Sequence, residues 1–207
     1  MTEAQHQSKT KFLDAALHVF RSKGYTATRI EDVCETAGLT KGSFFHHFDT
    51  KEALAVAAAE HWSVNTSGLF ASAPYRAVPD PLARLLAYVG FRKAILQGEL
   101  PQFTCLVGTM VQEVYDTHPA IRAACDRSIS EHAATLEADI AECMRQYGVK
   151  GDWTASSLAL YTQAVIQGAF ILAKAKGGPA VAADCIDHLR RYLELLFVQP
   201  QPEKETL

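Results

Sequence analysis

The chain lacks the features that mark secreted, membrane-spanning and disulfide-stabilised proteins. Its first residues, MTEAQHQSKTK, are polar, so we expect no signal peptide, and no apolar run reaches the length of a membrane-spanning helix. The five cysteines are odd in number and dispersed, and none belongs to a CxxC pair. This pattern argues against a disulfide scaffold or a zinc site and fits the reducing cytoplasm, without a membrane partner.

Sequence motifs of catalysis are also missing. The chain contains no nucleophile elbow, no glycine-rich phosphate loop and no paired metal-ligand motif. An enzyme would have to use Cys105 with one of the eight histidines, and no motif supports that pairing. We therefore expect a protein that is not an enzyme, with no catalytic residue, cofactor or metal.

Charge gives little information about partners. The net charge is −3, but residues 1–51 carry seven basic and six acidic side chains, so the excess negative charge lies in the remainder of the chain. A locally basic face on an acidic protein is compatible with nucleic-acid binding, although this small asymmetry does not by itself indicate it.

Apolar residues recur at helical spacing along the chain, and no useful stretch alternates with a period of two. We predict an all-α fold of about nine helices. They are expected at 9–23, in two short segments within 28–51, and at 50–70, 82–97, 101–115, 119–147, 153–176 and 179–197, with a proline-rich loop at 72–81. We divide the chain into residues 1–50, residues 51–198 and a polar, frayed tail at 199–207.

Residues 28–51 have the pattern of a helix-turn-helix. Gly38 stands where the chain needs a positive φ after a helix, and Thr40 can cap the helix that follows, as Thr28 can cap the helix before it. Phe44 and Phe48 continue the apolar face of the second helix. If they point inward, the outward side presents Lys41, Gly42, Ser43, Phe45, His46 and His47, which suits a DNA groove.

The segment AALHVFRSKGYTATRIEDVCETAGLTKGSFFHHFDTKEAL resembles the tetracycline-repressor (TetR) family of bacterial transcription regulators. The resemblance is strongest over residues 9–54, where the order and spacing of the family's glycines, threonines, aromatics and Lys-Glu-x-Leu match throughout. The segments CLVGTMVQEVYDTHPAIR and QGAFILAKA look like features of a subset of the family.

The resemblance implies which residues contact DNA. Bases and backbone would be read by Lys41, Gly42, Ser43, His46 and His47, and phosphates would be held by Thr28, Arg29, Thr40 and Lys51. Many family members carry Tyr where this chain has Phe45, so Phe45 would offer only an apolar contact, for example to a thymine methyl. The alternative for His46 and His47 is that both imidazoles are merely solvated.

The resemblance further implies that the second domain forms a homodimer and holds an inducer pocket. Leu160, Ala164, Gly168 and Ile171 form one candidate stripe for the interface, and Val181, Cys185, Leu189, Tyr192, Leu193 and Leu196 form another; either could instead be core. The candidate pocket residues are Trp62, Phe103, Cys105, Met110, Tyr161, Gln167 and Phe170, each of which could also be core.

Cys105 is a candidate sensor of electrophiles or oxidants. We expect it one turn into a helix opened by Pro101, where the helix N-terminus favours thiolate, and Lys174 and Lys176 would add to that effect if they lie near. The alternative is a small buried apolar residue.

Together these features predict a dimeric, ligand-responsive transcriptional regulator in the cytoplasm. We expect a repressor that a small molecule, or modification of a cysteine, releases from double-stranded DNA carrying a palindromic operator. The alternative is a helical interaction module without specific DNA binding. Salt dependence separates the two, because a DNA-binding protein loses affinity steeply as salt rises.

Overall fold

The computed structural model describes residues 3–197, and over that range the chain is all-helical, with ten α-helices and one short 3-10 helix. The predicted fold class is therefore confirmed. The predicted tail at 199–207 lies outside the described residues.

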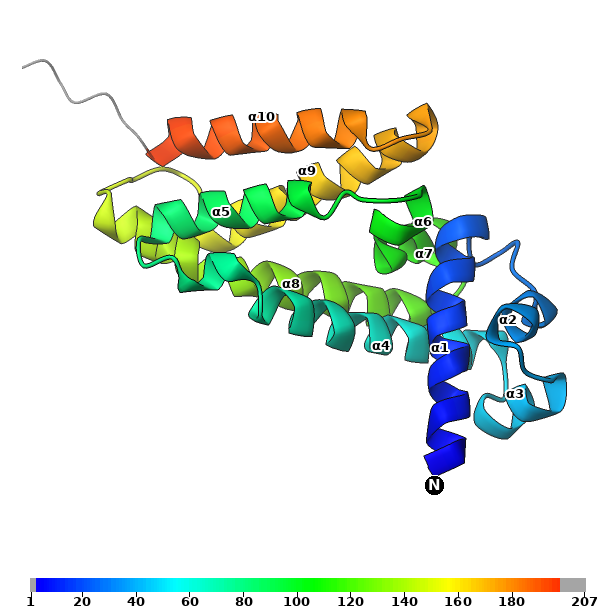
Figure 1. Cartoon of the computed structure of the whole chain (residues 1–207). Helices are drawn as coiled ribbons and strands as arrows, with labels where there is room; N and C mark the ends of the chain where they lie inside the picture. Colours follow the sequence, from blue (N-terminus) through cyan, green and yellow to red (C-terminus); the bar gives the residue numbers. More distant parts are fainter. Residues whose placement is uncertain (1–2, 198–207) are drawn as a thin grey trace, which may run out of the picture.

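The N-terminal helices sit at one end of the molecule (Figure 1). Helix α1 (Glu3–Lys23) ends at Gly24, whose φ of 81° lets the chain turn toward α2 (Ile30–Ala37). Helix α3 (Lys41–His47) follows, and α4 (Lys51–Ala71) then runs away from this end into the rest of the fold.

The turn between α2 and α3 forms as the sequence predicts. Gly38 adopts a φ of 65°, and the amide of Leu39 donates to the carbonyl of Cys34 at 3.0 Å, which closes the end of α2. The Thr40 side chain then accepts a hydrogen bond from the amide of Ser43 at 3.2 Å and so caps α3.

The C-terminal part is a bundle of long helices. Its elements are the 3-10 helix η1 (Pro74–Ala77), α5 (Pro81–Ala94), α6 (Leu100–Phe103), α7 (Leu106–Val114), α8 (Pro119–Gln146), α9 (Ala155–Lys176) and α10 (Ala180–Phe197). Helix α9 packs against both α8 and α10, and α8 packs against α4 and α5. The short helices α6 and α7 fill the space between this bundle and α1 (Figure 1).

The predicted single helix at 101–115 is wrong. The chain leaves helical geometry at Thr104, whose ψ is 156°, and α7 starts afresh with Cys105 as its N-cap. The Thr104 hydroxyl donates to the carbonyl of Leu100 at 2.7 Å, and the Cys105 sulfur accepts from the amide of Gly108 at 3.4 Å. These local bonds replace the helical ladder, and no glycine or proline marks the break.

Two apolar clusters stabilise the fold, and α4 belongs to both. Its first half contributes Leu54, Ala55, Ala58 and Ala59 to a cluster with α1, α2, α3, α7 and the start of α8. Its last turn contributes Phe70 to a second cluster with α5, α8, α9 and α10. The predicted inward positions of Phe44 and Phe48 are confirmed, since both are buried in the first cluster.

Helix α9 is the one helix within residues 3–197 that is long and apolar enough to cross a membrane, by length and composition only. The expectation that no segment reaches that length and composition therefore needs this exception. Its position between α8 and α10 explains the composition, because one face packs into the core while Leu160, Ile171 and Leu172 lie at the surface.

Replacing Gly38 with alanine is expected to destabilise the protein by about 1 kcal/mol, because no atom lies near enough to clash and only the left-handed backbone opposes a Cβ. Gly68→Ala is the matched control. Gly68 lies within α4 with open space around it, so alanine there should stabilise the helix by about 0.5–1 kcal/mol. Urea denaturation of both variants measures the difference, and equal effects would contradict the role assigned to Gly38.

Candidate nucleic-acid interface and interior cavity

Helix α3 is oriented by aromatic packing on its inner side. Phe44 is fully buried, and its ring meets Phe12 of α1 edge-on with the centroids 5.6 Å apart. Phe48 packs against the same Phe12 ring at 6.4 Å. These contacts fix which side of α3 faces outward.

The outward side presents most of the predicted DNA-contact residues. Arg29, Thr40, Lys41, Gly42, Phe45 and His46 are exposed, and Ser43 and His47 are half-buried. The Phe45 ring is 50% exposed although it is wholly apolar. An exposed phenyl group beside a lysine and a histidine is suited to a surface that another molecule covers.

Lys41 and Glu31 form an ion pair across the two helices of the motif, with Nζ 2.5 Å from Oε1. The hydrogen bond from Lys41 lowers the pKa of the Glu31 carboxyl. Both side chains are more than half exposed, so the pair contributes little to stability and the lysine can exchange partners.

The two histidines of α3 are held by the first turns of α1. His46 Nε2 lies 3.0 Å from the Gln5 side-chain nitrogen, and His47 Nε2 lies 2.7 Å from the Ser8 hydroxyl. Partial burial, together with the nearby His46 and Lys9, lowers the pKa of His47. His47 is therefore neutral near pH 7, with its ring position fixed.

Thr28 and Lys51 are directed into the protein rather than toward a phosphate. Thr28 is 1% exposed, and its hydroxyl donates to the carbonyl of Gly24 at 2.6 Å. The prediction that Thr28 caps α2 is wrong, since Arg29 is the N-cap and its amide donates to Asp32 at 2.8 Å.

The Lys51 ammonium donates to the carbonyls of Tyr25 and Thr28 at 2.9 and 2.8 Å and lies 4.3 Å from the centre of the Tyr25 ring. Burial lowers the pKa of Lys51. This lysine ties the start of α4 to the chain that connects α1 and α2. Sequence reasoning missed this role because these two carbonyls become neighbours of Lys51 only after the helices pack.

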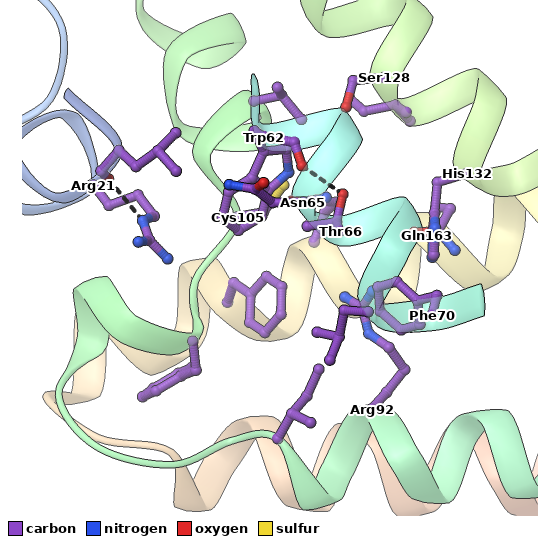
Figure 2. A pocket seen from close by; sticks show the side chains of 18 of the residues that line it. Arg21, Trp62, Asn65, Thr66, Phe70, Arg92, Cys105, Ser128, His132 and Gln163 are labelled. Carbon is purple, nitrogen blue, oxygen red and sulfur yellow. Dashed lines mark hydrogen bonds between the residues drawn. The ribbon is translucent and has the colours of Figure 1, made fainter. Parts of the chain in front are cut away.

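A cavity of about 290 Å³ lies where α1, α4, α5, α6, α7, α8 and α9 meet (Figure 2). Its lining residues are Leu17, Arg21, Trp62, Asn65, Thr66, Leu69, Phe70, Arg92, Ile95, Gln102, Phe103, Cys105, Val107, Ser128, Ile129, His132, Gln163, Gln167 and Phe170. About half of these residues are apolar and the others carry polar side chains, so the wall can both bury a small molecule and orient it.

Five of the predicted pocket residues line this cavity, namely Trp62, Phe103, Cys105, Gln167 and Phe170. Two do not. Met110 is fully buried in the first apolar cluster. Tyr161 is 44% exposed on the outer side of α9, where its ring packs against Tyr192 at 5.2 Å.

Sequence reasoning missed the charged and polar groups of the cavity, above all Arg21, Arg92, His132 and Gln163. In the sequence each of these residues appears as an ordinary polar position of a helix. Only Arg92 could have been identified from the sequence, because it follows the apolar residues of α5 at the helical spacing that predicts a buried position.

His132 belongs to a buried network at one end of the cavity. Its Nε2 lies 3.0 Å from the Tyr88 hydroxyl, which also accepts a hydrogen bond from Gln163 at 3.2 Å. Burial, with the charges of Arg92 and Arg76 nearby, lowers the pKa of His132 to about 3. The imidazole is therefore neutral at physiological pH.

Cys105 lies where the two apolar clusters meet and packs against both. It is half-buried, and Arg21 and Lys174 are close enough to interact electrostatically with its thiol. The Lys174 ammonium itself donates to the Thr109 hydroxyl at 2.6 Å. The expectation that Cys105 lies one turn into a helix opened by Pro101 is wrong, because α6 ends at Phe103 and Cys105 is the N-cap of α7.

Comparison with known proteins gives two family matches. Residues 12–58 match the model described as bacterial regulatory proteins, tetR family. Residues 81–185, about half of the chain, match the C-terminal domain of LmrA/YxaF-like transcriptional regulators.

Individual relatives agree with these matches. The HTH-type transcriptional repressor DhaR of Mycobacterium sp. (strain GP1) is 24% identical over 195 residues, which are 94% of this chain and 93% of DhaR. A TetR-family regulator from Agrobacterium tumefaciens has the same fold, with a TM-score of 0.81, 20% identity and coverage of 94% and 100%. A cysteine-substituted CifR, solved with 26-base-pair operator DNA, has a TM-score of 0.72, 18% identity and coverage of 88% and 95%.

Replacing Lys51 with methionine is expected to lower the free energy of unfolding by roughly 1–2 kcal/mol, because the substitution removes the charged donor from the Thr28 carbonyl and one of the two donors from the Tyr25 carbonyl. Lys41→Met is the control and should change stability by less than about 0.5 kcal/mol, since its ion pair is exposed. Chemical denaturation measures both. Unchanged stability with Lys51→Met, combined with lost affinity for DNA, would return Lys51 to the DNA-contact face.

Proposed function

The chain belongs to the TetR family of bacterial transcriptional regulators, and from that membership we propose that it is a homodimeric repressor that a small molecule releases from a palindromic operator. It is a DNA-binding regulator rather than an enzyme. We further propose that it forms a dimer, that it responds to a ligand, and that particular residues carry out each of these roles. Because it acts on bacterial DNA, we also propose that it works in the cytoplasm.

One observation carries the proposal: the cavity and the helix-turn-helix share their supporting helices. Trp62 and Thr66 of α4 line the cavity, whereas the first half of the same helix, including Leu54, is buried against α1, α2 and α3. Helix α1 also contributes Leu17 and Arg21 to the cavity wall. A ligand that moves these side chains therefore moves the elements that hold α3.

A second connection runs through α7. This helix begins at Cys105 on the cavity wall, and near its other end the Glu113 carboxylate accepts hydrogen bonds from the amides of Tyr25 and Thr26 at 3.2 and 2.9 Å. These amides belong to the turn that leads into α2. In the proposed mechanism, ligand binding favours a conformation in which the two α3 helices of the dimer no longer match successive major grooves.

The proposed dimer interface is the outer face of α9 and α10. Its exposed apolar residues are Leu160, Tyr161, Ile171, Leu172, Tyr192 and Leu195, with Ala164 and Gly168 between them. The predicted stripe on α9 is therefore at the surface. The predicted stripe on α10 is partly wrong, because Leu189 and Leu193 are buried in the core of the same chain.

A dimer also follows from the size of the reading surface. Helix α3 has seven residues, and a helix this short makes few base contacts, whereas a twofold dimer doubles them across a palindrome. We propose that Lys41, Gly42, Ser43, Phe45, His46 and His47 contact the major groove and that Arg29 and Thr40 contact phosphates. The free backbone amides at the start of α4 can donate hydrogen bonds to a phosphate, a contact that the Lys51 side chain does not make.

Modification of Cys105 is a second possible trigger, and a specific observation favours it. Cys105 is half-buried on the cavity wall beside Arg21 and Lys174, whereas Cys125 and Cys143 are fully buried, which raises the pKa of each thiol to about 12. A small electrophile that enters the cavity would therefore meet Cys105 first.

Lys41→Ala and His47→Ala are each expected to weaken operator binding about ten- to a hundredfold while the dimer stays intact. Lys41→Ala removes an exposed side chain and His47→Ala removes a half-buried one that packs on Phe12, and both leave the α9–α10 face unchanged. Fluorescence anisotropy on operator DNA selected from random duplexes measures affinity, and light scattering measures the dimer. Lys150→Ala, in the exposed connection between α8 and α9, is the control and should bind normally.

Ile171→Glu tests the dimer itself and should lose both the dimer and operator affinity, since it places a charge in the proposed interface. For the wild-type protein, affinity should fall steeply as salt rises. Loss of the dimer in Lys41→Ala would show that the reading face is misplaced. A flat salt response would favour an interaction module without specific DNA binding.

Alkylation with N-ethylmaleimide is expected to release operator DNA from the wild-type protein and from Cys185→Ser but not from Cys105→Ser. Cys185 is the appropriate control because it is the other half-buried cysteine among residues 3–197 and lies on α10, away from the cavity. Anisotropy before and after alkylation measures release. Equal release from all three proteins would end the sensor role of Cys105.

A further inference from the structure

Arg92 is a buried charge without a counter-charge. Its side chain extends from α5 toward the ring of Phe70 at the cavity wall, and the residue is only 8% exposed (Figure 2). Its Nε makes no hydrogen bond, and within residues 3–197 no carboxylate lies within ion-pair distance of the guanidinium. A buried, unpaired arginine is costly, so its presence calls for an explanation.

The surroundings of Arg92 do not supply the missing negative charge. The cavity wall contains two arginines, Arg21 and Arg92, and no aspartate or glutamate. His132, which also lines the cavity and interacts electrostatically with Arg92, is neutral at physiological pH and could only add positive charge. Asp139 is engaged by Arg84 at 2.8 Å and does not line the cavity.

Two aromatic rings compensate the charge only in part. The Arg92 guanidinium carbon lies 5.2 Å from the centre of the Phe70 ring and 5.7 Å from that of Phe170. Such contacts stabilise a cation through the face of the guanidinium. They leave Nε, the guanidinium nitrogen that is both buried and without a hydrogen-bond partner, without an acceptor.

We propose that the ligand of this cavity is a small organic anion with an apolar body, whose carboxylate or similar oxyanion pairs with Arg92. This inference rests on the proposed ligand response and specifies its chemistry. A guanidinium recognises two oxygens of an oxyanion at once, which neither a neutral nor a cationic ligand offers. The apolar body lies against Trp62, Phe103 and Phe170, and Gln163 and His132 are placed near the charged end.

The volume of the cavity limits the body to a modest size. About 290 Å³ lies just below the range of roughly 300–1,000 Å³ that ligand pockets occupy. A one- or two-ring aromatic acid, or a short aliphatic acid, meets both the volume and the charge requirement. A cationic compound of the same size would face Arg21 and Arg92 with no carboxylate to receive it.

The test uses three probes with one body and different charge: 2-naphthoate, 2-naphthamide and 2-naphthylmethylammonium. Calorimetric titration of the full-length dimer should show 2-naphthoate binding at least about tenfold more tightly than 2-naphthamide, and no binding of the ammonium compound. In Arg92→Met the preference of the naphthoate over the amide should disappear. Arg122→Met is the matched control, because Arg122 is exposed on α8, and it should keep the preference.

The outcomes separate this inference from the function on which it rests. Equal or tighter binding of the amide or the ammonium compound would overturn the anion site and leave the cavity as a ligand site. Retention of the preference in Arg92→Met would also overturn it. If none of the probes binds, the anion site is contradicted, whereas the ligand response is tested separately by the release of operator DNA. If Arg92→Met does not fold, Arg92→Lys keeps the charge and should keep the preference.

Discussion

The packing of α4 into two apolar clusters is the constraint on which the rest of the structure depends. Ala55, Ala58 and Ala59 allow α1 to approach its first half closely, and Phe70 anchors its last turn among the helices of the C-terminal bundle. A helix buried at both ends cannot tilt at one end without a response at the other. The position of α3 and the shape of the cavity therefore both depend on how α4 packs.

Local sequence was sufficient to predict the DNA-binding motif. The glycine at 38 and the cap at Thr40 act through neighbours a few residues away, and the inward positions of Phe44 and Phe48 follow from the helical spacing of the apolar residues. All three features occur as predicted. The break before Cys105 was not predictable in the same way. It comes from side-chain bonds to the backbone, which compete with the helix without changing the apolar pattern.

The parts of the site that sequence reasoning misplaced depend on contacts between distant segments. Lys51 donates to carbonyls more than twenty residues earlier in the chain, and Met110 packs into the core because α1 covers it. The same is true of Arg92. Its lack of a carboxylate partner is a property of the assembled cavity, and no pattern in α5 alone could reveal it.

Gly24 has a consequence for how mutations would affect regulation. A Cβ built at this position would lie 2.3 Å from the Glu113 carboxylate, which accepts the amides of Tyr25 and Thr26. Any other residue would push that carboxylate away and cut the connection between α7 and the helix-turn-helix. In the proposed mechanism, a genetic screen for variants that stay folded and bind DNA but do not respond to a ligand should therefore recover both Gly24 and Glu113, although neither residue lines the cavity or belongs to α3.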